Sequence, residues 1–166
     1  MKKLIVIVSV FSLFIILSCK EETKKLKGNS EFNLSVSVGP MTNCIEIKIN
    51  ESKLLKPQKI NYNVQAKLFD PPIRPITCTQ AIVQMATEGY RPANAYELNA
   101  LNESYPLIES IDGCPNWIIL ALGSTYVADS ITVAVALSEG SYGRYMYESQ
   151  FDNTKGGSCY FLGVKD

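Results

Sequence analysis

The chain has 166 residues, of which 46% are hydrophobic and 19% are charged, and lysine plus arginine equals aspartate plus glutamate at 16 each. This composition excludes collagen, wholesale disorder and a polytopic membrane protein, and a neutral chain has no electrostatic attraction for DNA or RNA. Histidine is absent, which excludes histidine-based triads, general bases and metal ligands. We therefore expect no nucleic-acid partner, no cofactor and no metal centre.

The first 18 residues have the pattern of a secretory signal peptide. Lys2 and Lys3 form a positive n-region. The stretch from Leu4 to Leu17 is an apolar h-region that is too short to cross a membrane as a helix. We therefore expect residues 1–18 to be removed on export.

A cysteine stands directly after this leader, in the segment Ile16-Leu17-Ser18-Cys19. The segment resembles the lipobox of bacterial lipoproteins, in which a branched apolar residue and then a small residue precede the cysteine. The resemblance implies that Cys19 is acylated and inserted in a lipid bilayer, where several acyl chains give stable anchoring. We thus expect an outer-membrane lipoprotein of the bacterial cell envelope. The alternative is an ordinary secreted protein with a chance cysteine at this place.

Residues 19–30 are interpreted as the lipidated cysteine followed by a flexible tether. The run is charged and holds few large apolar groups, so burial cannot offset the entropy of ordering it. Its start, Lys20-Glu21-Glu22, resembles the export signal of bacterial surface lipoproteins, and a solvated spacer explains it equally well. The domain that follows is expected to be either surface-exposed or periplasm-facing.

Residues 31–69 alternate apolar and polar side chains with period two. The alternation covers Phe32 to Val38, Cys44 to Ile49 and Tyr62 to Leu68, and turn residues separate the three runs. This pattern predicts half-buried antiparallel strands. The proline-rich stretch from Asp70 to Pro75 then predicts a stiff loop.

Helical periodicity replaces this alternation after residue 77. Apolar residues recur at helical spacing between Ala81 and Ala86, and Thr77 or Thr79 is the candidate N-cap. Gly89 stands where a C-terminal cap belongs. The pattern predicts one short helix that ends before Gly89.

A second short helix is predicted between Asn94 and Tyr105. Asn94 is a candidate N-cap with Glu97 three residues later, a capping-box arrangement. Just before it, Pro92 holds Arg91 extended, so Arg91 can cap backbone carbonyls or pair with Glu97. A structural arginine that joins the two helices and a ligand-binding arginine both remain open interpretations.

Four further strands follow the helices. Trp117 to Leu122 is continuously apolar, which indicates a strand covered on both faces. The other strands are predicted at 131–137, 144–150 and 158–165. The order of antiparallel strands, two short helices and antiparallel strands predicts a single α+β domain over 31–166. It comprises a strand-rich part at 31–69 and a helix pair plus sheet at 77–166.

Four cysteines remain after the anchor, namely Cys44, Cys78, Cys114 and Cys159. An even number in an exported chain of this size predicts two disulfides with three possible pairings. Of these we favour Cys44–Cys78 with Cys114–Cys159. The wide spacings and the lack of a C-x-x-C motif argue against a metal site, and a catalytic thiol would need a base that no histidine supplies.

Three motifs in the second half occur in the order seen in a family of small uncharacterised bacterial domains. They are Gly89-Tyr90-Arg91-Pro92-Ala93 followed by Glu97-Leu98, then Ala121-Leu122-Gly123-Ser124, and finally Cys159-Tyr160-Phe161-Leu162-Gly163-Val164-Lys165. The chain resembles this family over residues 78 to 166. The resemblance marks Gly89, Arg91, Pro92 and Glu97 as a structural motif and assigns no activity.

The same half is also similar to the C-type lectin-like fold, which has two helices, then a W-I-G-L strand, and a final strand with a cysteine. Trp117-Ile118-Ile119-Leu120 is similar to the W-I-G-L strand. The resemblance implies a lectin-like α+β domain stapled by disulfides. The signatures of calcium-dependent sugar binding in that fold are missing. We interpret the late oxygen-rich group of Glu148, Asp152 and Asn153 as a solvated turn rather than a cation site.

Aromatic residues surround the last predicted hairpin, at Tyr142, Tyr145, Tyr147 and Phe151. The last three share a face if the strand is regular, and exposed aromatic faces stack on sugars and anchor protein partners. These four are our candidate ligand-binding residues, and the alternative is that their face belongs to the core.

The sequence as a whole predicts a non-enzymatic envelope lipoprotein that binds a glycan or protein through loops between Gly123 and Gly157. The second hypothesis is a structural or accessory subunit of an envelope complex, joined by edge pairing of the strands within 31–69. The third is a hydrolase that uses two carboxylates.

Overall fold

The computed structural model of the chain describes residues 26–41, 44, 46–105, 111–113 and 116–165. The predicted signal peptide, Cys19, the start of the tether and Cys114 lie outside these ranges. Within them, no helix is long and apolar enough to cross a membrane.

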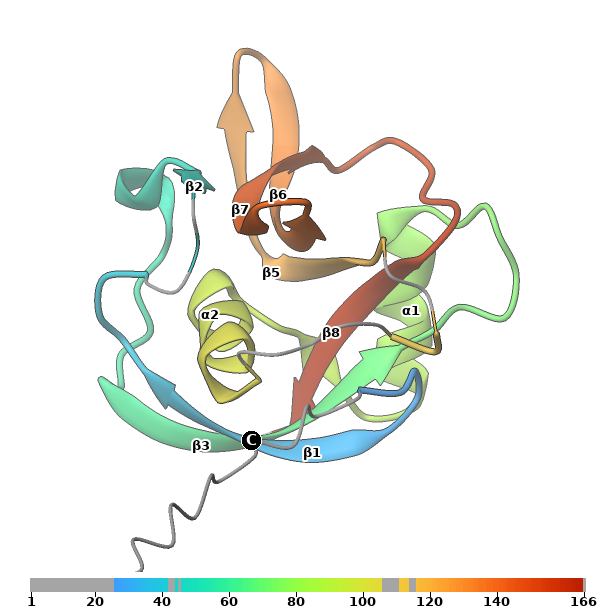
Figure 1. Cartoon of the computed structure of the whole chain (residues 1–166), viewed down its shortest axis with the longest axis horizontal. Coiled ribbons are helices and arrows are strands. Elements are labelled where there is room, and N and C mark those ends of the chain that lie inside the picture. The colour runs from blue at the N-terminus through green and yellow to red at the C-terminus, as the bar shows by residue number, and fades with distance from the viewer. Residues whose placement is uncertain (1–25, 42–43, 45, 106–110, 114–115, 166) are drawn as a thin grey trace, which may run out of the picture.

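The described residues form eight strands, two α-helices and one short 3-10 helix (Figure 1). In chain order these are β1 (Glu31–Ser37), β2 (Glu46–Lys48), the 3-10 helix η1 (Glu51–Lys53), β3 (Asn61–Phe69), α1 (Cys78–Thr87), β4 (Arg91–Pro92), α2 (Ala95–Ser104), β5 (Ile118–Ala128), β6 (Ile131–Gly140), β7 (Gly143–Gln150) and β8 (Cys159–Lys165). The predicted α+β class is therefore confirmed.

The strands join one sheet with the order β1-β3-β8-β5-β6-β7-β2, and the two-residue β4 pairs with β8 beside this path. The pairs β1–β3, β3–β8, β5–β6 and β6–β7 are antiparallel, as predicted. Two pairs, β5–β8 and β2–β7, are parallel, contrary to the expectation of a purely antiparallel sheet. The β5–β8 pair is parallel because β8 does not extend the β6–β7 meander but crosses to the middle of the sheet and runs along β5.

The two helices contribute to two separate hydrophobic clusters. Helix α2 supplies Leu98 and Leu101 to one of them, which we call the first core cluster, and α1 supplies Ala81 and Met85 to the second core cluster. Successive residues of β5 alternate between the two, with Ile119 and Ala121 in the first and Leu120 and Leu122 in the second. Strand β5 is therefore covered on both faces, as its continuous apolar sequence predicted.

Local sequence signals set the ends of both helices. Thr77, rather than Thr79, caps α1, since its Oγ1 accepts a hydrogen bond from the Gln80 amide at 3.2 Å. Gly89 follows α1 with a φ of +76°, a conformation that glycine adopts without strain. Asn94 caps α2 and forms the predicted capping box with Glu97.

Gly123 holds the segment before α2 against the sheet. The register between β5 and β6 shifts between Ala121 and Thr125, and the amide of Gly123 donates to the carbonyl oxygen of Ala93 at 2.8 Å. A Cβ at Gly123 would lie 2.6 Å from the carbonyl oxygen of Pro92. This close approach fixes β4 and so positions the neighbouring Arg91.

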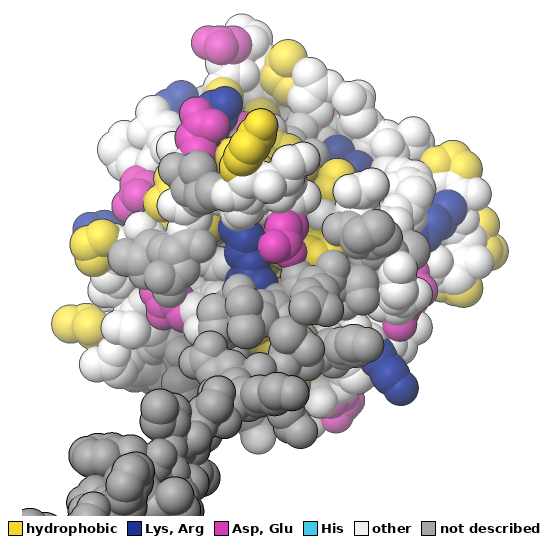
Figure 2. Space-filling model, viewed as in Figure 1, with side chains coloured by type: hydrophobic (Ala, Val, Ile, Leu, Met, Phe, Trp, Pro, Cys, Tyr) yellow, Lys and Arg dark blue, Asp and Glu magenta, His cyan; other side chains and the backbone are white. Residues whose placement is uncertain are grey.

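The surface mixes charges of both signs. In the view of Figure 2, acidic and basic side chains are interspersed among polar ones, and hydrophobic side chains protrude singly or in small groups. This distribution agrees with a formal net charge of zero for the whole chain. Net charge alone therefore does not mark a binding face on this side of the molecule.

Candidate functional site

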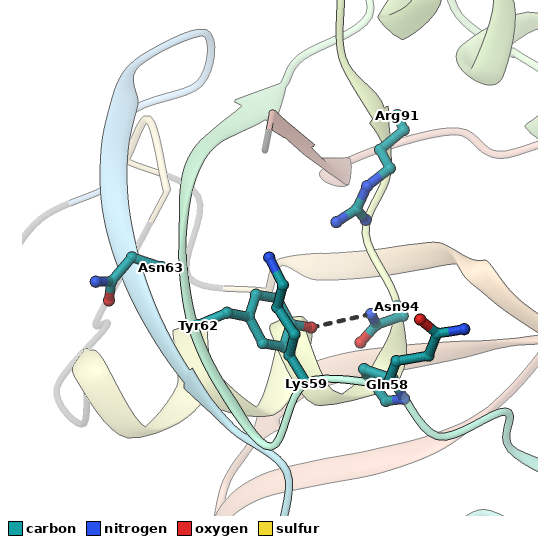
Figure 3. A pocket seen from close by; sticks show the side chains of 7 residues that line it. Gln58, Lys59, Tyr62, Asn63, Arg91 and Asn94 are labelled. Atoms are coloured by element: carbon teal, nitrogen blue, oxygen red, sulfur yellow. Dashed lines mark hydrogen bonds between the residues drawn. The ribbon is translucent and has the colours of Figure 1, made fainter.

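A polar pocket of about 400 Å³ lies between the loop that precedes β3 and the segment that precedes α2 (Figure 3). Its lining residues are Pro57, Gln58, Lys59, Tyr62, Asn63, Arg91 and Asn94. Two of these side chains are cationic and four carry an amide or a hydroxyl group. The lining is therefore suited to a polar ligand, and an anionic group on that ligand would meet two cations.

Arg91 forms one wall of the pocket through a two-bond ion pair with Glu97. The guanidinium Nη1 donates to Oε2 of Glu97 at 3.1 Å, and Nη2 donates to Oε1 at 2.9 Å. The Glu97 side chain is fully buried, whereas the Arg91 side chain is 41% exposed. Arg91 thus makes the predicted pair with Glu97, its Nη1 also lies 3.5 Å from the backbone oxygen of Pro92, and its exposed part lines the pocket.

Tyr62 and Asn94 extend this hydrogen-bonded cluster. Asn94 Nδ2 donates to the Tyr62 hydroxyl at 3.3 Å, the dashed line in Figure 3, and the Tyr62 hydroxyl donates to Oε1 of Glu97 at 3.2 Å. Burial raises the pKa of Tyr62 above its ordinary value, so the phenol stays protonated and able to donate. The cluster holds polar side chains from β3, from β4 and from the start of α2 in fixed positions.

The opposite wall of the pocket is the loop before β3. Gln58 and Lys59 are exposed and come from this loop. In the view of Figure 3 the Lys59 side chain overlaps the Tyr62 ring, and Asn63 points away from that ring. The two cationic side chains, Lys59 and Arg91, thus come from segments far apart in sequence and line the same opening.

The hydrogen bonds of the cluster converge on Glu97. Glu97 accepts hydrogen bonds from Nη1 and Nη2 of Arg91 and from the Tyr62 hydroxyl. It also accepts one from the backbone amide of Asn94 at 2.7 Å. A carboxylate with this many hydrogen-bond donors around it holds its neighbours in place. Within the described ranges, no group of three or more acidic or cysteine side chains is placed to hold a metal ion.

The four aromatic residues singled out from the sequence do not form one exposed platform. Tyr142 is 83% exposed, at the turn between β6 and β7. Tyr147 and Phe151 pack against the second core cluster, and the Tyr145 ring covers Gly140, where a Cβ would lie 2.8 Å from it. Tyr147 and Phe151 therefore take the core-associated role that was the alternative, whereas Tyr145 packs on Gly140 of the neighbouring strand and Tyr142 stands apart.

The described cysteines, Cys44, Cys78 and Cys159, are free thiols. Cys78 and Cys159 lie in the second core cluster, whereas Cys44 packs against the first. The favoured Cys44–Cys78 pair is therefore not present, and its members lie on opposite faces of the sheet. Burial raises the pKa of all three thiols, that of Cys159 to about 12, so each is protonated at neutral pH.

The late oxygen-rich group does not gather into a cation site. Glu148 Oε1 accepts from the Tyr126 hydroxyl at 2.5 Å, and Asn153 Nδ2 donates to Gln150. These partners hold the two side chains in separate local contacts, and Glu148 lies within strand β7 rather than in the predicted turn.

Comparisons with protein-family models, with curated proteins and with solved structures gave no match to this chain. The site is therefore interpreted from its own geometry.

No sequence motif marks Lys59, Gln58 or Tyr62 as site residues. The signal that they share is a set of polar side chains after Pro57, at the start of a strand. Ordinary surface loops have the same pattern, so it does not indicate a binding site. Arg91 and Glu97 were singled out because capping and pairing are local. The pocket itself depends on bringing the loop at 57–59 next to Arg91, and no local pattern encodes that contact.

Proposed function

We propose that this protein is a membrane-anchored envelope lipoprotein whose domain is a non-enzymatic binding module for a glycan. The observation that carries the proposal is the pocket formed by Lys59, Arg91, Tyr62, Asn94 and Gln58. Amides, a phenol and cations are the groups that recognise hydroxyl-rich and acidic sugars by hydrogen bonding. The pocket is open to solvent, which suits one sugar residue or the end of a longer glycan.

The lectin-like character of the domain forms part of this proposal. Its support is the element order, in which two helices precede the strand after Trp117 and the final strand begins at Cys159. Disulfide stapling is proposed with a changed pairing, because Cys78 and Cys159 share the second core cluster. Peptide mapping without reduction tests this, and a Cys44–Cys78 peptide would contradict it.

The test of glycan binding is a screen of the purified full-length lipoprotein against bacterial envelope oligosaccharides, followed by calorimetric titration of any hit. Lys59→Ala and Gln58→Ala should each weaken binding by roughly fivefold or more, since each removes a hydrogen-bonding group from the pocket. Lys56→Ala is the matched control, because Lys56 is an exposed lysine of the same loop that does not line the pocket. Equal losses for Lys56→Ala and Lys59→Ala would contradict the assigned site.

Anchoring and orientation are tested on intact cells. Labelled palmitate should be incorporated into the wild-type chain and not into Cys19→Ala. Protease shaving, with detection of an epitope placed after Asp166, then distinguishes a surface-exposed domain, which loses the signal, from a periplasm-facing one, which keeps it until lysis. Incorporation of label into Cys19→Ala would contradict lipidation at that residue.

A second function, as an accessory subunit of an envelope complex, is favoured by one observation. β1 stands at one end of the described sheet, and it pairs only with β3. Its sequence from Glu31 to Ser37 carries a single charge, so little opposes the addition of a partner strand. Photocrosslinking from Asn33 in β1 tests this, with Gln84 in α1 as the control position; crosslinks from Gln84 alone would exclude edge pairing.

A further inference from the structure

The loop between η1 and β3 exposes aliphatic side chains beside the pocket. Leu55 is 90% exposed and Ile60 is 69% exposed, whereas the preceding Leu54 is buried and anchors the loop to the core. The two exposed residues flank the pocket-lining segment 57–59 on its two sides. The loop runs along the left margin of Figure 1, between η1 and the start of β3.

The same loop is cationic. Lys56 and Lys59 are both exposed, and the stretch from Leu54 to Phe69 contains no aspartate or glutamate. Arg91 adds its partly exposed guanidinium from the other side of the pocket. Exposed aliphatic side chains bracketing lysines are the combination that binds the interface of an anionic bilayer, because the former enter the acyl boundary and the latter meet the headgroups.

An exposed aliphatic residue alone says little about function. Val83 in α1 is 59% exposed and Val127 in β5 is 58% exposed, but Val83 has no lysine or arginine within five residues on either side. Leu55 and Ile60 differ from Val83 because two lysines, Lys56 and Lys59, lie between them in sequence. The segment 57–59 between them also lines the polar pocket. Charge complementarity therefore selects a negatively charged membrane as the partner of this loop.

We propose that Leu55 and Ile60 dock on the surface of an anionic phospholipid bilayer, with Lys56 and Lys59 against its headgroups, so that the pocket opens toward that membrane. The inference extends the proposed function, since it assigns to the pocket a glycan carried on a lipid. The docking surface itself does not depend on which sugar the pocket takes.

The experiment uses the mature chain with Cys19→Ser, which carries no acyl group, in flotation assays with vesicles. Vesicles of phosphatidylcholine alone should not retain it, and vesicles that also contain phosphatidylglycerol should. The double variant Leu55→Ser/Ile60→Ser should bind these vesicles more weakly by a factor of roughly ten or greater. Lys56→Ala should bind roughly fivefold more weakly, and added salt should weaken the wild type.

The controls separate docking through this loop from non-specific hydrophobic adsorption to lipid and from misfolding. Val83→Ser removes an aliphatic residue outside the loop that is 59% exposed, and it should bind as the wild type does. Leu55→Trp places an indole at a position proposed to enter the acyl boundary of the bilayer. The fluorescence of this indole should be quenched by lipids brominated on the acyl chain. Equal binding to uncharged vesicles, equal loss in Val83→Ser, or an unquenched indole would each overturn the proposal.

Failure of membrane docking and failure of glycan binding would give different experimental results. If soluble glycans bind and vesicles do not, the docking inference fails and the glycan site stands. If anionic vesicles bind through Leu55 and Ile60 while the glycan screen is empty, the docking surface stands and the glycan assignment fails. The Leu55→Ser/Ile60→Ser variant should keep its affinity for any soluble glycan, because neither residue lines the pocket.

Discussion

The guanidinium of Arg144 lies over the ring of Trp117, 5.8 Å from its centroid, and both side chains are buried. Its Nη1 donates to the backbone oxygen of Asn102 at 3.1 Å and to Oδ1 at 2.7 Å, whereas Nε and Nη2 have no hydrogen-bond partner. Burial lowers the pKa of Arg144 from its ordinary value. The ring face and one amide side chain thus hold a charge that is otherwise costly to bury.

This arrangement predicts strong coupling between Arg144 and Asn102. Arg144→Met removes the donor to the side-chain oxygen of Asn102, and Asn102→Leu takes one of its two acceptors away from Arg144 Nη1, which keeps only the backbone oxygen of that residue. The double variant removes both problems, so its loss of unfolding free energy should be smaller than the sum of the single losses by about 1–3 kcal/mol. Urea unfolding of the four proteins measures this, and simple additivity would show that the pair does not interact.

Glu97→Gln should destabilise the domain and loosen the pocket. The substitution removes the charge that Arg91 pairs with, and it places a donor where Glu97 accepts hydrogen bonds from Tyr62 and Asn94. Because Arg91 is partly solvated, we expect a loss of about 2 kcal/mol, less than for a fully buried pair. Glu46→Gln, which breaks the exposed pair with Lys48, is the matched control and should cost less than about 0.5 kcal/mol. Similar losses for the two variants in denaturant unfolding would contradict the prediction.

Gly123→Ala should be poorly tolerated for a steric reason. The added Cβ would lie 2.6 Å from the carbonyl oxygen of Pro92 and 2.8 Å from that of Ala93, and both are backbone atoms that cannot rotate away. We expect a loss of about 1–3 kcal/mol and weaker binding at the proposed glycan site, since Arg91 precedes Pro92. Gly156→Ala, where a Cβ meets nothing within 4 Å, should be close to neutral in the same thermal unfolding assay.

Stability should fall steadily at alkaline pH. Burial raises the pKa values of Tyr90 and Tyr126 from 10.0 to about 12. These groups are protonated in the folded state at pH values where the unfolded chain has already released the protons, so unfolding is favoured as pH rises from about 10 to about 12. Tyr126→Phe removes one such group and should flatten the decline of the unfolding free energy between about pH 10 and 12. An unchanged slope in that variant would show that Tyr126 titrates normally.

The features that the sequence predicted well are those that neighbouring residues decide. Thr77, Asn94 and Glu97 cap helices through partners three residues away, and Gly89 ends α1 by its own backbone conformation. Strand β5 could be predicted as doubly covered because every residue of its first half is apolar. In each case the signal and the structure lie within one turn or one strand.

The features that the sequence did not reveal depend on contacts between distant segments. The parallel pairing of β5 with β8 needs a crossover that periodicity cannot indicate. Strand β2 is confined to Glu46–Lys48, shorter than the predicted run from Cys44 to Ile49. The aromatic face of β7 alternates as predicted, but only tertiary packing decides that Tyr147 lies against a core. The pocket likewise joins residues more than thirty positions apart in sequence.

The position of β8 has a consequence for how this chain is made. Strand β8 lies between β3 and β5 in the centre of the sheet, although it is formed by residues 159–165. Until those residues have left the ribosome, β1–β3 and β5–β6–β7 are two separate ribbons with no shared hydrogen-bonded neighbour. A nascent chain therefore cannot complete the sheet before β8 has been made, although the two ribbons can form earlier. If such a chain is exported as an unfolded polypeptide, this order delays its final fold until the last strand is available.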